Sequence, residues 1–219
     1  MESNKILLFG GGIVLTLAFL VGAYFVTSKP AVTYFPELNK VQTGDNIKWS
    51  DKNKIILVEY SDFQCPACQA YWQMLESLNS DKEFVDKVQK NVTFVYRQFP
   101  LDNIHKNTRT AGQAAEAAAM QGKFFPMHDM LFENQKSWEL EDNPYEIFKQ
   151  YAKDLQLDLE KFEKDYNAQE TKDKIENQYK SGITADVKGT PTFFLNGNKL
   201  DNPRSAEEFK KILLDAVAK

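Results

Sequence analysis

Residues 55–68 read IILVEYSDFQCPAC, and the rest of the chain can be arranged around this stretch. It opens with four apolar residues, Ile55 to Val58, an unbroken run of the kind that a buried central strand requires. Beyond it, apolar residues recur at helical spacing at Tyr71, Trp72, Leu75 and Leu78. The pattern predicts a strand that leads directly into a helix, with Cys65 and Cys68 at the junction.

These two cysteines are the only ones in the chain, and a Cys-x-x-Cys pair at a strand–helix junction is typical of a thioredoxin-like redox motif. Free backbone N–H groups and the helix dipole favour an anion at Cys65, and the thiolate is the attacking species in disulfide exchange. Pro66 suits the first helical position. Cys68 lies one turn further on. We therefore expect Cys65 to be the exposed nucleophile and Cys68 the buried resolving thiol.

Two other uses of the cysteine pair fit the sequence less well. A structural zinc site needs four ligands, and the only histidines, His105 and His128, lie far along the chain in separate predicted segments. A structural disulfide across so short a loop would gain little entropy and would be easily reduced. No metal or cofactor is expected. For both histidines the pattern favours satisfied structural roles over catalysis.

Composition places the chain among ordinary globular proteins. It has 219 residues, 42% of them hydrophobic and 26% charged, which is enough for one domain with a sizeable core and an appendage. The net charge of −4 gives no reason to expect nucleic acid, which calls for a basic surface. With both cysteines inside one motif, the fold must be stable without a disulfide framework.

The appendage is amino-terminal. Residues 6–27 carry no charge and are long enough to cross a bilayer as a helix, and Lys5 and Lys29 bracket them. We expect an uncleaved signal-anchor, with residues 1–5 as a short cytoplasmic tail. A cleaved signal peptide is the alternative, because residues 21–23 loosely resemble a small-residue cleavage site.

The remainder divides into a spacer and a domain. Residues 28–40 contain two prolines and no clear periodicity, so they are predicted to link the anchor to a domain over 41–219. The expected location is the cell membrane, as a single-pass protein with its catalytic domain on the extracytoplasmic side.

Four further strands are predicted around the central one. Residues 45–49 fit a short edge strand, and residues 92–99 are rich in β-branched and aromatic residues. Residues 192–200 fit two strands joined by Asn196-Gly197, a strong hairpin signal. The predicted order is strand, redox helix, strand, helical block, hairpin and helix.

The helices have recognisable patterns of their own. Ser80–Glu83 and Ser205–Glu208 fit capping boxes. A helical block is expected over about 103–185, and it includes one stripe of small residues that would allow close packing, Thr108, Ala111, Ala114, Ala115, Ala118 and Ala119. Ile175, Tyr179 and Ile183 mark another apolar side on a charged background. Those charges are expected to form a solvated face.

Taken together, residues 59–72 and 189–197 resemble the two halves of a DsbA-type thiol–disulfide oxidoreductase site. Residues 99–101, His105 and the segment 122–132 are also similar to that family. The resemblance covers roughly residues 41 to 219. It implies an α/β thioredoxin-like fold with an inserted helical domain, here preceded by one transmembrane helix.

The resemblance also implies roles for individual residues. The proline that matches Pro191 is cis in that family and lies against the disulfide, so Thr190 would offer its backbone to an extended substrate segment. Glu59 matches a buried acid that could relay a proton for Cys68. Strong oxidases of the family often carry Pro-His between the cysteines. This chain has Pro66 and Ala67, which implies a less oxidising couple.

The predicted function is an extracytoplasmic enzyme that introduces disulfide bonds into exported proteins. Its implied partner is a quinone-linked membrane reoxidase similar to DsbB or to vitamin K epoxide reductase, and the protein is expected to be a monomer. The same chemistry could run in reverse, in a reductase or isomerase supplied with electrons across the membrane. A non-catalytic chaperone of the same fold is the third hypothesis.

Overall fold

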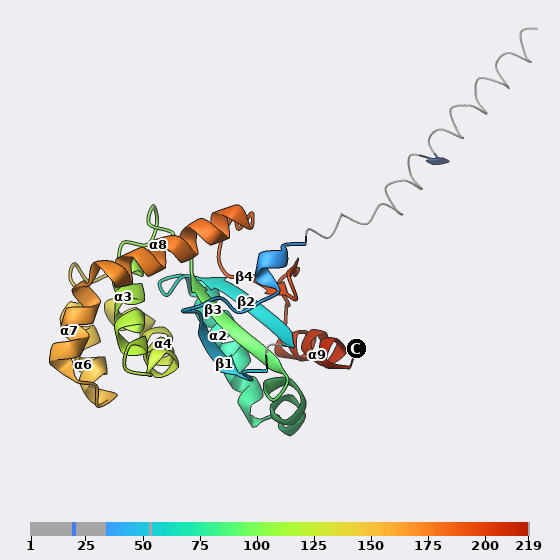
Figure 1. The fold of residues 1–219 in the computed structure, drawn as a ribbon, viewed down its shortest axis with the longest axis horizontal. Coiled ribbons are helices and arrows are strands. Elements are labelled where there is room, and N and C mark those ends of the chain that lie inside the picture. The colour runs from blue at the N-terminus through green and yellow to red at the C-terminus, as the bar shows by residue number, and fades with distance from the viewer. Residues whose placement is uncertain (1–18, 21–33, 53, 219) are drawn as a thin grey trace, which may run out of the picture. The chain divides into compact units, whose positions relative to one another are not determined.

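A mixed β-sheet forms the centre of the fold (Figure 1). The computed structural model describes residues 19–20, 34–52 and 54–218. In this part of the chain the sheet has five strands, in the order β1-β3-β2-β4-β5. They are β1 (Asn46–Trp49), β2 (Ile55–Ser61), β3 (Val92–Gln98), β4 (Thr192–Leu195) and β5 (Asn198–Lys199). β2 and β3 are parallel, and the other neighbours are antiparallel.

The apolar run predicted to form the central strand does so. β2 lies in the middle of the sheet, and every residue of it after Ile55 is buried. Its side chains alternate between the two faces: Leu57 joins the larger hydrophobic core, whereas Ile56 and Val58 join a smaller one on the opposite face. Glu59 follows Leu57 by two residues, so it lies on the face of the larger core.

Helices surround the sheet and extend beyond one side of it. The helices are α2 (Pro66–Ser77), α3 (Thr108–Ala119), α4 (Phe124–Glu133), α5 (Gln135–Trp138), α6 (Tyr145–Asp154), α7 (Leu159–Asn167), α8 (Gln169–Thr184) and α9 (Ala206–Val217). Short turns of helix are η1 (Pro36–Leu38), η2 (Leu78–Ser80) and η3 (Phe84–Gln89). Figure 1 shows α3, α4, α6 and α7 grouped beside the sheet, with α8 returning along it. The helical block between β3 and β4 is therefore α3 to α8.

Small side chains allow α3 to sit at the centre of that block. The alanines at 111, 114, 115 and 118 are fully buried, as the predicted stripe requires, and α3 contacts α4, α7 and α8. Gly112 lies against the Gln98 side chain, where an added Cβ would come within 3.2 Å of the amide oxygen. This close approach brings α3 against the end of β3.

Three local expectations are wrong. The cap before η3 is Asp81 and not Ser80, because the Asp81 carboxylate accepts the N–H of Phe84 at 3.0 Å. At α9, Ser205 caps the Glu208 N–H as predicted, but the Glu208 carboxylate accepts from the N–H of Arg204. Ile183 is 53% exposed and does not join the apolar side of α8.

The spacer is shorter than expected at its carboxyl-terminal end. Leu38 is fully buried, and the Phe35 N–H donates to the Gly197 carbonyl at 2.7 Å. Gly197 has a positive φ of 76°, and an added Cβ would meet the Phe35 carbonyl at 2.6 Å. The domain therefore includes residues from Tyr34 onward.

The predicted anchor over 6–27 lies outside the described residues, apart from Phe19 and Leu20. Among the helices that the structure does describe, none is both long and apolar enough to cross a membrane.

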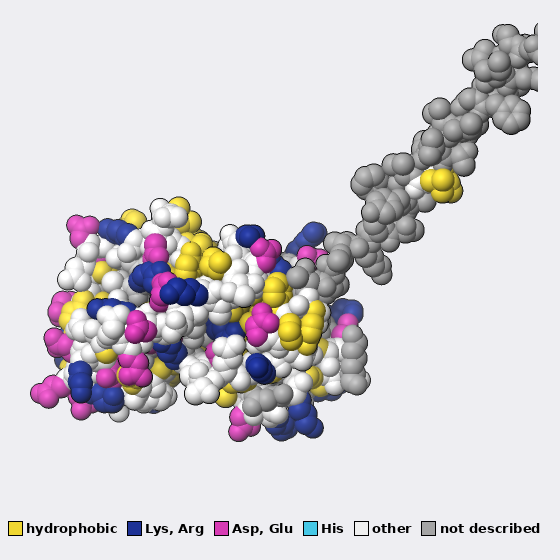
Figure 2. All heavy atoms as spheres, turned by 45° about the horizontal axis from the view of Figure 1, so that its top comes forward, with side chains coloured by type: hydrophobic (Ala, Val, Ile, Leu, Met, Phe, Trp, Pro, Cys, Tyr) yellow, Lys and Arg dark blue, Asp and Glu magenta, His cyan; other side chains and the backbone are white. Residues whose placement is uncertain are grey.

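Charges of both signs are interspersed on the surface of the domain, as Figure 2 shows for one face. Several belong to short-range helical pairs, such as Glu176 with Lys180 on α8. Exposed pairs of this kind contribute little to stability. The charged side of α8 is thus a solvated face, as expected.

Candidate active site

The cysteine pair lies where β2 leads into α2. Cys65 is the N-cap residue, with extended backbone angles, and Pro66 occupies the first helical position as predicted. The Cys65 N–H donates to the Asp62 carbonyl at 3.1 Å, which closes the turn before the helix. Cys65 is 7% exposed and Cys68 fully buried, and both are free thiols. Cys65 is therefore the more accessible sulfur, although it is far more covered than we expected.

The two thiols have opposite acidities. A hydrogen bond from the Cys68 thiol, assisted by Thr190 and by the backbone N–H groups of Cys68 and Ala67, lowers the pKa of Cys65 to about 6. Burial raises the pKa of Cys68 well above its usual range. At neutral pH, Cys65 is therefore a thiolate and Cys68 keeps its proton. This division of roles is what a nucleophile and a resolving thiol require.

Glu59 lies on β2 beneath α2 and is only 4% exposed. Burial raises the pKa of this carboxyl to about 7, and the charge of Cys65 adds to the effect. Conversely, the Glu59 charge is one cause of the high pKa of Cys68. A group that titrates near pH 7 beside a buried thiol can accept and return the proton of that thiol.

We expect Glu59 to make the stability of the reduced protein depend on pH. The folded state holds the Glu59 proton up to about pH 7, whereas an unfolded glutamate loses it near pH 4.5, so folding stability falls as the pH rises between these values. The loss is about 3 kcal/mol. Urea unfolding should show that the free energy of unfolding of Glu59→Gln, relative to wild type, rises by about this much between pH 4 and pH 8.

A matched control is Glu133→Gln, which changes an exposed glutamate on α4. Its stability relative to wild type should be nearly the same at the two pH values. A Glu59→Gln variant that follows the wild-type profile would show that this carboxyl titrates normally.

The loop before β4 completes the site. The Thr190–Pro191 bond is cis, as the resemblance implied. Cys65 Sγ lies 3.4 Å from the carbonyl oxygen of Thr190, to which the Cys65 thiol donates when it is protonated. The Pro191 carbonyl accepts from the Asn202 amide at 2.8 Å. The structure thus brings Thr190 and Pro191 to the cysteine pair from more than 120 positions along the chain.

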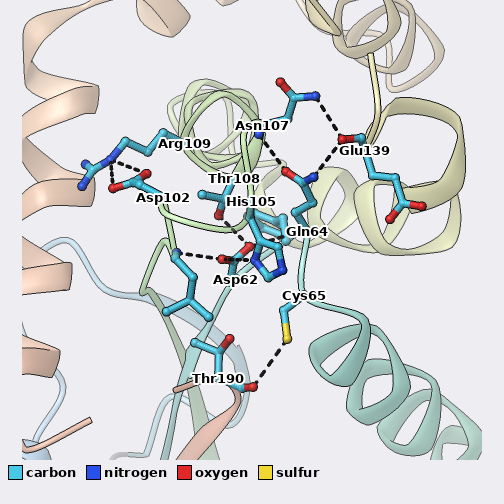
Figure 3. A network of polar contacts seen from close by, with 12 residues as sticks. Asp62, Gln64, Cys65, Asp102, His105, Asn107, Thr108, Arg109, Glu139 and Thr190 are labelled. Carbon is cyan, nitrogen blue, oxygen red and sulfur yellow. Dashed lines mark hydrogen bonds and ion pairs between the residues drawn. The ribbon is translucent and has the colours of Figure 1, made fainter. Parts of the chain in front are cut away.

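Sequence reasoning missed a second set of side chains that holds the turn (Figure 3). Asp62 is buried, and its carboxylate accepts from the Gln64 N–H, the Thr108 hydroxyl and the Leu101 N–H. The Gln64 side chain accepts from the N–H of Asn107 and donates to the Glu139 carbonyl. The only available signal was the position of Asp62, directly after the central strand.

The helical block also reaches the motif through Gln135. Its amide donates to the carbonyl of Phe63 at 2.7 Å and to that of Cys65 at 3.3 Å. Among the described residues, no group of three or more His, Cys, Asp or Glu side chains could hold a metal ion.

A family model with the description Thioredoxin matches residues 50–215, which is most of the chain. The chain belongs to the thioredoxin family. The match includes the β2–α2 junction with both cysteines and the loop that contains Pro191. The family predicted from the motifs at 59–72 and 189–197 is therefore confirmed.

Solved structures of the thioredoxin family share this fold. BdbD from Bacillus subtilis superposes with a TM-score of 0.71 at 20% identity, covering 86% of this chain and 99% of that one. The α-DsbA1 protein of Wolbachia pipientis gives 0.69 at 19% identity, over 84% and 96%. A thioredoxin-like oxidoreductase from Silicibacter pomeroyi gives 0.63 at 21% identity, over 81% and 94%. The predicted thioredoxin-like fold, with its helical block, is the DsbA-like form.

Curated relatives include a protein named Na(+)/H(+) antiporter NhaA 3 from Salinispora tropica, 32% identical over 174 residues. A second, named Na(+)/H(+) antiporter NhaA 1, comes from a Mycobacterium strain and is 31% identical over 171 residues. The aligned regions cover 80% and 77% of this chain. The chain spans about a quarter of the length of these relatives.

Proposed function

We propose that this protein is a thiol–disulfide oxidoreductase that introduces disulfide bonds into exported proteins. The proposal rests on the opposite pKa shifts of the two thiols: the pKa of Cys65 is lowered to about 6 and that of Cys68 is raised. A stabilised thiolate favours the reduced form of a couple and so makes its disulfide a better oxidant.

The reaction starts from the Cys65–Cys68 disulfide. A substrate thiolate attacks Cys65 Sγ, a substrate–Cys65 bond forms, and Cys68 leaves and takes a proton from Glu59. A second substrate thiolate then attacks the substrate sulfur of this mixed disulfide, and Cys65 leaves as the stabilised thiolate. Two electrons pass from the substrate to the cysteine pair. Glu59 is suited to its step because its pKa of about 7 lets it change protonation state at neutral pH.

Thr190 and two exposed apolar residues support binding of an extended polypeptide. The Thr190 N–H donates no hydrogen bond to any other residue that the structure describes, so it can pair with a substrate backbone. Ile104 is 72% exposed and Leu140 is 78% exposed. Both lie in loops that the Asp62 and Gln64 contacts tie to the cysteine turn.

The cellular setting is also part of the proposal. The uncharged stretch at 6–27 supports a single-pass anchor in the cell membrane, with the domain on the extracytoplasmic side. A membrane reoxidase linked to quinones, similar to DsbB or to vitamin K epoxide reductase, would then restore the disulfide. A reductase or isomerase supplied with electrons across the membrane is the competing function, because Pro66-Ala67 lacks the histidine of strong oxidases.

The reduction potential of the full chain in glutathione buffers tests the direction of electron flow. We expect a value between about −120 and −180 mV, the range of DsbA and protein disulfide isomerase. The physical reason is the thiolate of Cys65, which stabilises the reduced protein. A value of about −270 mV, that of thioredoxin, would show that the protein reduces disulfides and does not introduce them.

A further inference from the structure

His105 lies beside the cysteine turn and is held there by Asp62 (Figure 3). The Asp62 side chain is fully buried, and its Oδ2 lies 2.8 Å from His105 Nδ1. The same oxygen accepts the Leu101 N–H, and Oδ1 accepts two further donors. A carboxylate only accepts hydrogen bonds, so Nδ1 must carry the imidazole proton. With Nδ1 as the donor to Asp62, Nε2 is the ring nitrogen that this contact leaves free.

That second nitrogen is available. Nε2 makes no hydrogen bond to any residue in the described part of the chain, and the His105 side chain is 13% exposed. In Figure 3 the ring extends from Asp62 on the side where the Cys65 side chain lies. The main-chain carbonyl of Asp62 also accepts the Cys65 N–H, so one residue fixes both the ring and the cysteine. The ring is thus held at the site while its free nitrogen faces outward.

The other histidine shows what a structural role looks like here. His128 is 4% exposed, and the rings of Phe63, Tyr96 and Phe124 surround it. Burial lowers the pKa of His128. His105 differs, because Asp62 would keep three hydrogen bonds without it and because its second nitrogen reaches the surface.

We propose that His105 is a catalytic base for the substrate thiol, with Asp62 as its positioning residue. This inference rests on the proposed function. Nε2 takes the proton of the incoming substrate thiol, and the resulting thiolate attacks Cys65 Sγ. The substrate–Cys65 bond forms as the Cys65–Cys68 bond breaks, and Glu59 protonates the departing Cys68. The proton on His105 then passes to solvent, or returns to the substrate in the reverse reaction.

The charges around the ring leave Asp62 as its direct electrostatic partner. The ionisable groups nearby are Asp62 and Cys65 from the β2–α2 turn, Asp102 and Lys106 from the loop of His105, Arg109 from α3, and Lys188 from the loop before β4. Each of the three cations is paired with a carboxylate of its own, Arg109 with Asp102, Lys106 with Asp142 and Lys188 with Asp186.

The test compares the full chain with its His105→Asn variant in the oxidised form. Asparagine can still donate a hydrogen bond to Asp62 but offers no base. The substrate is a short peptide with two cysteines, and acid quenching with mass spectrometry follows the formation of its disulfide. A thiol of ordinary pKa is only a few per cent ionised at pH 7, so His105→Asn should react about 10- to 30-fold more slowly there. At pH 9 the two rates should agree within about twofold, because most of the thiol is already ionised.

Two further measurements separate this role from others. A catalyst of proton transfer leaves the equilibrium unchanged, so wild type and His105→Asn should have the same reduction potential. Added imidazole should restore part of the lost rate at pH 7. Asn103→Ala, which alters an exposed polar side chain in the same loop, should keep the wild-type pH profile.

Several outcomes would overturn the inference. They are an unchanged rate at pH 7, an equal loss at every pH, and a shifted reduction potential. If the variant does not fold, the imidazole nitrogen signals of wild type decide, because a proton on Nε2 at neutral pH would exclude the proposed base. If wild type itself does not oxidise the peptide, the proposed function fails before His105 is tested.

Discussion

Replacing Cys65 by serine should abolish disulfide exchange, whereas replacing Cys68 by serine should leave Cys65 able to form mixed disulfides that no thiol of the protein resolves. The difference follows from their positions, because only Cys65 reaches the surface and carries the lowered pKa. With Cys68→Ser, a substrate cysteine can still exchange onto Cys65 when a mixed disulfide with glutathione is supplied. Cys68 is then absent, so only a second thiol of the substrate can release Cys65, and a substrate with a single cysteine stays bound. The measurement is the mass of the adducts formed with a peptide that has one cysteine, together with the oxidation of a reduced two-cysteine protein by wild type.

The two serine variants are matched controls for each other, because each exchanges one sulfur for one oxygen in the same turn. Both should keep the wild-type circular dichroism spectrum. An adduct that accumulates on the Cys65→Ser variant would reverse the assigned roles. Substrate binding that survives in Cys65→Ser, together with an inactive wild type, would favour the chaperone hypothesis.

Replacing Asp45 by alanine should destabilise the fold by about 3 kcal/mol. Asp45 forms a two-pronged ion pair with Arg97, with distances of 3.0 Å from Nε to Oδ1 and 2.8 Å from Nη2 to Oδ2. Both side chains are buried, Arg97 at 1% and Asp45 at 4% exposure. The variant therefore leaves the Arg97 guanidinium buried without its carboxylate partner. We place the effect at the lower end of the range for buried pairs because a cavity of about 650 Å³ adjoins Arg97 and admits water.

Urea unfolding at pH 7 measures this loss, and Asp102→Ala supplies the comparison. Asp102 also forms a pair with an arginine, Arg109, but these side chains are 47% and 37% exposed. Its removal should cost less than about 1 kcal/mol. If both variants lost a similar free energy of unfolding, burial would not increase the cost of leaving Arg97 without its partner.

The elements next to the motif could be read from the sequence because their signals are local. The apolar run before Cys65 predicted the central strand, and Asn196-Gly197 predicted the hairpin. The cap of η3 was misplaced by one residue, since Ser80 and Asp81 are both good cap residues and only the backbone decides between them. The pairing of Glu59 with the motif came from the family resemblance and not from any local pattern.

The contacts around Asp62 could not be predicted in the same way. His105 and Thr108 meet it across 43 and 46 positions, and Asn107 meets Gln64 across 43. No periodicity links residues so far apart, because their meeting depends on how the helical block folds back against the sheet. The exposure of Cys65 was overestimated for the same reason, since the Thr190 loop covers it from more than 120 positions away.

The bonds from Asn107 and Gln135 tie the helical block to the cysteine motif. Asn107 donates to the Gln64 side chain, and Gln135 donates to the carbonyls of Phe63 and Cys65. The helical block therefore holds the backbone that carries the reactive sulfur. The position of the reactive sulfur therefore depends on the helical block as well as on the cysteine motif. A transplanted motif without this helical block would lose these side-chain contacts to its backbone.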